Sequence, residues 1–188
     1  MSVAMSLVAL LDESPNYGLQ LRNVFEERTG GVWPLNVGQV YTTLARLERD
    51  GFVRRRSSDA DEKMFEIVPA GRQRLHEWFR TPARKDAPER DELVLKLVLA
   101  LGRSGLDAVD VIQAERKAAV ELLQQYTKLK RDNTEDDLGW LFLLDSLIFQ
   151  AEARVRWLDM CQERLTRTQQ PTTTQKSSRP RERIEVKR

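Results

Sequence analysis

One expected helix carries polar side chains whose types and spacing suit hydrogen bonding to the bases of nucleic acid. At about 100° per residue, a helix over 37–50 gathers one polar set on one side, which consists of Gln39, Thr42, Thr43 and Arg46. In a DNA major groove, glutamine can pair with adenine, arginine with guanine, and a threonine methyl group can contact the thymine methyl. The same composition is also typical of a plain solvated helix face, and the pattern alone does not separate the two interpretations.

Further candidates for contact with a phosphate backbone lie on and after this helix. Tyr41 is at the margin of the polar face, where its ring can pack while its hydroxyl reaches a phosphate. A basic set on either side of a polar turn consists of Arg54, Arg55, Arg56 and Lys63. Residues 1–80 hold 11 basic and 11 acidic residues, but the segment 39–56 holds five arginines and two acids. The positive charge is therefore gathered locally, where it could contact phosphates or enter a minor groove.

The elements that must position these side chains follow from hydrophobic periodicity and turn residues. Expected elements are helices over 3–11, 17–28 and 37–50, a hairpin of strands over 52–56 and 63–68, and a helix over 69–80. Asn36 is expected to cap the helix that carries the polar face, and Gly51 to end it. Three short helices followed by a hairpin predict a winged helix-turn-helix in a mainly α-helical protein. Such folds bind DNA, but they also serve as protein-interaction modules without specific DNA binding.

Several segments together resemble the PadR family of transcriptional regulators. They are Tyr-Gly-Leu-Gln-Leu at 17–21, Glu-Arg-Thr-Gly-Gly at 27–31, the stretch 33–53 around Gly-Gln-Val-Tyr at 38–41, and Pro-Ala-Gly at 69–71. The match covers roughly residues 4–80 and is specific as a set. Thr42 stands where the family usually has proline, and Lys-Met-Phe-Glu at 63–66 is a looser match to the tyrosine-rich wing of the family.

The resemblance implies a role for each set of candidate residues. Gln39, Tyr41, Thr42, Thr43 and Arg46 would contact the groove and phosphates of double-stranded DNA, and the basic set of the hairpin would form the wing contacts. The family pattern implies a homodimer, usually a repressor, whose DNA binding is relieved by a small-molecule effector. The long helices after the wing resemble the branch of the family that carries a larger C-terminal domain.

The second half of the chain predicts a long-helix dimerisation domain. A winged helix domain over 1–80 is followed by an expected linker over 81–90, helices over 91–101, 106–131 and 135–166, and a disordered basic tail over 167–188. Apolar residues in three- and four-residue steps predict a coiled-coil-like seam, which includes Leu141, Leu144, Ile148, Val155 and Leu158. The helix over 106–131 or a second copy of the chain can complete this seam. We favour a homodimer, because a winged helix on a palindrome needs two copies at a fixed spacing.

Aromatic residues on the last helix suggest a possible effector pocket. Trp140 and Trp157 belong to a second apolar stripe on this helix, and an aromatic-lined space between helices can hold a planar ligand. Such a stripe is more often simply core. Cys161 is expected to be a buried, inert thiol rather than a redox sensor. The basic tail adds either non-specific phosphate contacts or an inert solubilising end.

Other functional classes find little support in the sequence. His76 is the single histidine and Cys161 the single cysteine, so no disulfide framework, cysteine-based zinc site or metal site is expected. We find no glycine-rich phosphate loop, no cofactor site and no indication of an enzyme. No apolar run reaches the roughly 20 residues of a membrane span, and no signal peptide is visible. The expected location is the cytoplasm.

Overall fold

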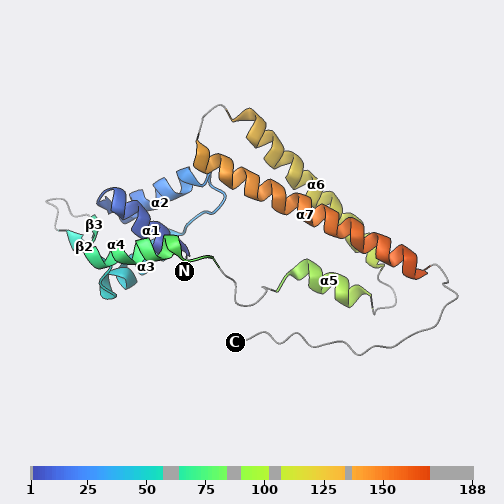
Figure 1. The fold of residues 1–188 in the computed structure, drawn as a ribbon, viewed down its shortest axis with the longest axis horizontal. Coiled ribbons are helices and arrows are strands. Elements are labelled where there is room, and N and C mark those ends of the chain that lie inside the picture. The colour runs from blue at the N-terminus through green and yellow to red at the C-terminus, as the bar shows by residue number, and fades with distance from the viewer. Residues whose placement is uncertain (1, 57–63, 84–89, 102–106, 134–136, 170–188) are drawn as a thin grey trace. The chain divides into compact units, whose positions relative to one another are not determined.

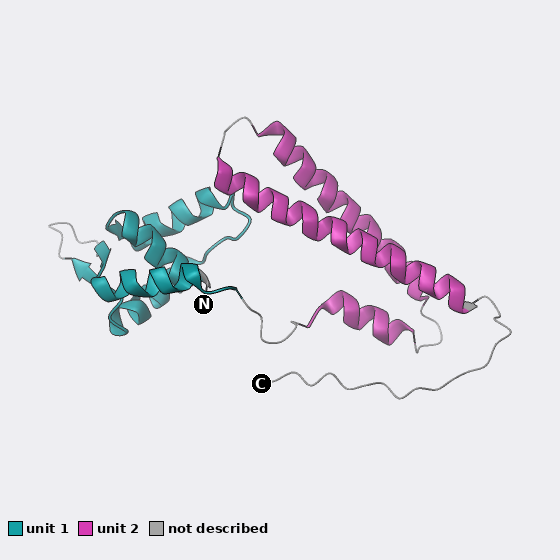
Figure 2. Cartoon of the chain, in the orientation of Figure 1, with its two compact units in different colours: residues 1–84 teal, residues 85–188 magenta. Residues whose placement is uncertain are grey.

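The chain divides into two compact units, residues 1–84 and 85–188 (Figure 2). The structure, a computed structural model, describes residues 2–56, 64–83, 90–101, 107–133 and 137–169. The predicted contact Lys63 and most of the expected basic tail lie outside these residues. The described part is mainly helical with one small antiparallel sheet, as the sequence predicts (Figure 1). No helix in the described ranges is long and apolar enough to cross a membrane.

The first unit contains four helices and three short strands within the described residues. In chain order these are α1 (Ser2–Glu13), β1 (Asn16–Tyr17), α2 (Gly18–Arg28), α3 (Val37–Arg49), β2 (Val53–Arg56), β3 (Met64–Ile67) and α4 (Pro69–Arg80). The predicted hairpin forms by antiparallel pairing of β2 with β3, with Arg55 opposite Phe65. The sequence analysis did not anticipate β1, which pairs with the other edge of β3 and gives the sheet order β1-β3-β2.

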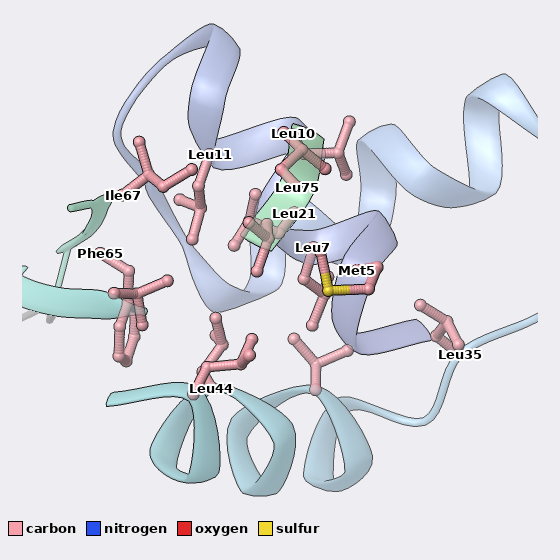
Figure 3. Close-up of a cluster of buried hydrophobic side chains, with 14 residues drawn as sticks. Met5, Leu7, Leu10, Leu11, Leu21, Leu35, Leu44, Phe65, Ile67 and Leu75 are labelled. Atoms are coloured by element: carbon pink, nitrogen blue, oxygen red, sulfur yellow. The ribbon is translucent and has the colours of Figure 1, made fainter. Parts of the chain in front are cut away.

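A single apolar core holds the helices of this unit on the sheet. Figure 3 shows Leu7 of α1, Leu21 of α2 and Leu44 of α3 gathered near Phe65 of β3. Leu7, Leu21 and Leu44 are fully buried, and each such leucine contributes roughly 1.5–3 kcal/mol relative to an exposed one. Because all three helices bury side chains in one cluster, the orientation of α3 is fixed by the core.

Both ends of α3 are defined by the residues that the sequence analysis assigned to them. The side chain of Asn36 accepts a hydrogen bond from the Gly38 N–H at 2.8 Å, which confirms Asn36 as the N-cap. At the other end Gly51 has φ +76, a left-handed conformation that glycine adopts without a Cβ penalty. The chain turns there at once, and the N–H of Phe52 donates to the Leu47 carbonyl at 2.9 Å. The base of the wing is therefore tied directly to the end of α3.

The second unit is built around a hairpin of two long helices. It comprises α5 (Glu92–Ala100), α6 (Ala108–Asp132) and α7 (Leu138–Gln169). Helices α6 and α7 lie side by side (Figure 1). Two side-chain contacts show their antiparallel register. Gln113 bonds Gln162 at 2.6 Å and Arg116 pairs with Asp159 at 2.6 Å.

Helix α5 is held against this hairpin by apolar and ionic contacts. Leu93 and Leu97 of α5 form a buried cluster with Ile112 of α6 and Leu158 of α7. The Asp91 carboxylate caps α5, accepting from the Leu93 N–H at 2.9 Å, and also pairs with Arg154 of α7 at 2.9 Å. The arginine hydrogen bond, more than the backbone contacts, lowers the pKa of Asp91 below its usual value.

Candidate nucleic-acid interface

Helix α3 presents one buried and one exposed face, as the sequence pattern predicts. Val40 and Leu44 are completely buried in the core of the first unit. On the opposite side Gln39, Thr42 and Arg46 are exposed and line one shallow hollow of the surface. Arg46 has no ion-pair partner among the described residues, so its guanidinium is available for an external acceptor. The geometry thus brings a hydrogen-bonding amide, a hydroxyl and a cation onto one face of a rigid helix.

Two predicted groove contacts on this helix differ in their exposure. Only 7% of Thr43 is exposed, so its predicted role as a groove contact is corrected to packing at the edge of the hollow. Thr43 follows Thr42 by one position, and this rotation of about 100° is enough to carry it toward the core. Thr42 remains exposed, and its hydroxyl donates to the Gly38 carbonyl at 2.8 Å. This bond uses the hydroxyl proton of Thr42 and leaves its methyl group available for an apolar contact.

Tyr41 is positioned by a glycine whose role the sequence analysis did not recognise. Tyr41 is 44% exposed. Its ring lies against Gly18, the first residue of α2. A Cβ atom added to Gly18 would lie 2.7 Å from Cε1 of Tyr41, closer than van der Waals contact allows. Gly18 therefore lets the Tyr41 ring pack against α2. The signal was present in the Tyr17-Gly18 motif, but only the structure shows which ring requires the glycine.

The three arginines of the wing have different surroundings. Arg54 pairs with Glu66 on the opposite strand at 2.5 Å. Arg55 pairs with Glu48 of α3 at 2.8 Å, and its guanidinium lies 5.8 Å from the centre of the Phe65 ring. Arg55 therefore ties the wing to the end of α3. Arg56 is exposed and pairs with no carboxylate in the part of the chain that the structure describes, which makes it the free cation of the described wing.

The predicted dimerisation residues lie mainly within the hairpin of the second unit. Leu144 and Leu158 are completely buried in a single chain, because α6 of the same chain covers this side of α7. Leu141, Ile148 and Val155 are half-buried. Leu144 and Leu158 therefore have no surface left to offer to a second copy, and any dimer contact on α7 must use other side chains.

The two predicted pocket tryptophans are in different environments. Trp157 lines two cavities beside α5, α6 and α7, with volumes of ≈ 640 and ≈ 390 Å³. Trp140, near the start of α7, is half-buried and lines neither of them. Cys161 lines the smaller cavity, and burial, the largest influence on it, raises the pKa of its thiol. Within the described residues, no cluster of histidine, cysteine and acidic side chains is suited to hold a metal ion.

Comparison with known proteins finds the same division of the chain. Residues 7–77 match the Transcriptional regulator PadR-like family, and residues 89–166 match the family described as Virulence activator alpha C-term. The chain is 25% identical to the negative transcriptional regulator PadR of Bacillus subtilis over 167 residues, which cover 82% of this chain and 92% of that protein.

Crystal structures of Bacillus subtilis PadR share the fold. The structure in complex with operator DNA has a TM-score of 0.64 and 23% identity, over 88% of this chain and 99% of that one. The structure in complex with p-coumaric acid has a TM-score of 0.66 and 24% identity, over the same shares of 88% and 99%.

Proposed function

Because this chain belongs to the PadR-like family of transcriptional regulators, we propose that it represses transcription as a homodimer bound to a palindromic operator. It is a DNA-binding transcriptional regulator rather than an enzyme. In our proposal, the exposed face of α3 enters the major groove and the wing lies over the adjacent backbone. Since its partner is DNA, we propose that it acts in the cytoplasm.

The observation that carries this proposal is the exposed polar face of α3. Gln39, Thr42 and Arg46 are exposed together, and the core side of the same helix is fully buried. A helix held in this way presents its side chains at fixed positions, which base-edge recognition requires. Tyr41, held on Gly18, and Arg56 on the wing then supply phosphate contacts on either side.

Replacing Arg46 by alanine is expected to weaken binding to the operator by about tenfold, in line with roughly 1–3 kcal/mol for one bidentate contact to a guanine. Preference at a single base pair should be lost, while binding to a scrambled duplex should change little. Fluorescence anisotropy with an operator selected from a duplex library measures both. The matched control is Arg74→Ala, which removes an arginine of α4 that pairs with Glu77 at 3.4 Å. Equal losses in the two variants would contradict base recognition by Arg46.

Replacing Arg56 by alanine is expected to lower the salt dependence of DNA binding. If Arg56 contacts a phosphate, the slope of log K against log salt should fall by about one in magnitude. Arg54→Ala is the matched control on the same strand, and its slope should change less, since Arg54 is occupied by Glu66 at 2.5 Å. The measurement is anisotropy at four or more salt concentrations. A slope change at Arg54 as large as that at Arg56 would mean that DNA displaces Glu66.

We propose that the homodimer forms through an apolar stripe on the exposed side of α7. The stripe consists of Leu138, Phe142, Phe149 and Met160, whose exposed fractions are 60%, 65%, 68% and 39%. At about 100° per residue, these four positions fall within an arc of about 40°. Exposed apolar side chains aligned on one face of a helix indicate a partner; Arg156, on the same arc, separates the first three from Met160. A second copy fits, because a winged helix that binds a palindrome must be paired.

Regulation by a small effector completes the proposal. Bacillus subtilis PadR binds p-coumaric acid in one of its crystal structures, which supports an effector for this chain as well. An effector acts by favouring a conformation that binds operator DNA less tightly, and its affinities for the two conformations must differ for this to occur. The cavities lined by Trp157 lie in the second unit and are the candidates for such a site.

A further inference from the structure

The second unit contains a cavity of ≈ 390 Å³ where α5 meets the hairpin of α6 and α7. Its walls are largely apolar, with Leu97 and Val98 from α5, Ile112 from α6, and Trp157 and Leu165 from α7. This volume lies within the usual range for small-molecule sites, which are mostly apolar with a few polar groups. Because the walls come from all three helices, the cavity exists only when α5 is packed in place.

The polar groups of this cavity are few and are contributed by α7. They are the Trp157 indole N–H, the Cys161 thiol, the Arg164 guanidinium and the Thr168 hydroxyl, and the last already donates to the Arg164 carbonyl at 2.8 Å. The positive charge of Arg164 acts on Cys161 by lowering the pKa of the thiol against the larger effect of burial. Arg164 is exposed and pairs with no carboxylate among the described residues, whereas Arg167 pairs with Glu163 at 3.4 Å. The cavity thus has one uncommitted cation.

We propose that this cavity binds an aliphatic carboxylate, with the hydrocarbon chain between the apolar walls and the carboxylate on Arg164. A guanidinium is suited to this role because it offers two parallel N–H donors to a carboxylate. The leucine, isoleucine and valine walls gain from covering methylene groups. As an effector site, the cavity rests on the proposed regulatory function, but the binding itself does not require DNA.

The same walls disfavour a phenolic acid. The hydroxyl of a phenol would leave water on entering the cavity, and once Arg164 holds the carboxylate the lining offers that hydroxyl only the Trp157 indole N–H, the Thr168 hydroxyl and the weak Cys161 thiol. A hydroxyl that gives up its hydrogen bonds to water for fewer partners in a largely apolar lining loses free energy, whereas a methylene group gains it. We therefore expect an aliphatic acid to bind more tightly than an aromatic acid with a phenolic hydroxyl.

Alkylation of Cys161 provides a direct assay of occupancy, because this residue is the single cysteine of the chain and lies in the cavity wall. The rate of reaction of the full chain with iodoacetamide is measured with increasing octanoate, decanoate or dodecanoate, all below the concentration at which they form micelles. Each alkanoate should slow the reaction. The apparent affinity should rise up to about fourfold per added methylene, from the transfer free energy of a buried CH₂, until the cavity is full. Protection by p-coumarate should be weaker.

Two arginine variants test the position of the carboxylate. Arg164→Gln should weaken protection by dodecanoate about tenfold, since a charged hydrogen-bond pair is lost. Arg167→Gln is the matched control one turn away, because Arg167 does not line this cavity. In this variant, dodecanoate should protect Cys161 from alkylation as well as it does in the unchanged chain. Rates are compared with and without alkanoate within each variant, so a change in the intrinsic reactivity of the thiol cancels. Equal effects of the two substitutions, or equal protection by dodecanol, would overturn the assignment.

Dilution and DNA binding distinguish the remaining outcomes. If alkylation of Cys161 in the absence of any alkanoate becomes slower as the protein concentration rises, a second copy covers the thiol and the proposal fails. Absence of protection by every alkanoate also overturns it. Operator binding is measured on the same preparations. A chain that binds operator but shows no protection refutes the cavity proposal alone, whereas protection without operator binding refutes the DNA proposal alone.

Discussion

Replacing Gly71 by alanine is expected to destabilise the first unit by about 3 kcal/mol, which is the upper part of the range for overpacking a core. A Cβ atom at this position would lie 2.1 Å from the carbonyl oxygen of Phe52 and 2.8 Å from Cγ1 of Ile67. The Phe52 carbonyl cannot easily move aside, because it accepts a hydrogen bond from the Val68 N–H at 3.2 Å. Thermal unfolding followed by circular dichroism should show a transition of this unit lowered by roughly 15 °C.

This prediction is a clear test because helix propensity and packing predict changes of opposite sign in the stability of the first unit. Alanine in place of glycine inside a helix normally gains about 0.5–1 kcal/mol. At Gly71 the steric overlap with backbone exceeds that gain, so α4 must shift away from the base of the wing. Ala70→Ser is the matched control, since it also adds one heavy atom but at an exposed neighbouring position. If the two variants melt together, then Gly71 does not hold α4 against the wing.

The elements of the first unit could be predicted because their local signals agree. The helical spacing of apolar residues in α3, the capping side chain of Asn36 and the glycine at its end all mark the same helix. Strand β1 could not be predicted, because Asn16–Tyr17 is two residues long and forms only by pairing with β3. Such pairing between distant segments leaves no periodic trace in so short a segment.

The candidate site was predictable in position but not in its ion pairs. Side-chain types identified Arg54, Arg55 and Arg56 as a cationic group, yet Glu48 and Glu66 occupy two of them. These ion pairs depend on the strand register and on the packing of the wing against α3. Neither of these can be derived from residue composition. The sequence placed Thr43 on the polar face because the boundary of a face at 100° per residue is uncertain by one position. Burial of Thr43 settles that boundary.

The seam of α7 shows a different limit of periodicity. A repeat of apolar residues at three- and four-residue steps predicts that a helix has a helical partner, but it does not identify the partner. Leu144 and Leu158 are fully buried within one chain, so α6 supplies the contact that the sequence analysis favoured assigning to a second copy. The evidence for a second copy now comes from the side chains left exposed on the other side of α7.

Replacing both Phe142 and Phe149 by aspartate is expected to convert the protein to a monomer and to weaken operator binding by at least about a hundredfold. In the proposed homodimer, two copies joined by α7 would bind the second half-site intramolecularly, and loss of that linkage typically costs a factor of 10²–10⁴. Charges placed opposite their own copies would also repel across the two-fold axis. Sedimentation velocity measures the mass, and anisotropy with a palindromic duplex measures the affinity.

The fold should tolerate this double change, because Phe142 and Phe149 are already 65% and 68% exposed. An unchanged helical content by circular dichroism checks that the α6–α7 hairpin persists. Phe79→Asp is the matched control, since this phenylalanine is 70% exposed on α4 of the first unit and lies outside the stripe. The control should remain a dimer with unchanged affinity for a single half-site duplex and for the palindrome. A double variant that sediments as a dimer would exclude the exposed stripe of α7 as the interface. Helix α5 would then be the next surface to test, because its Val98 and Leu99 are 62% and 64% exposed.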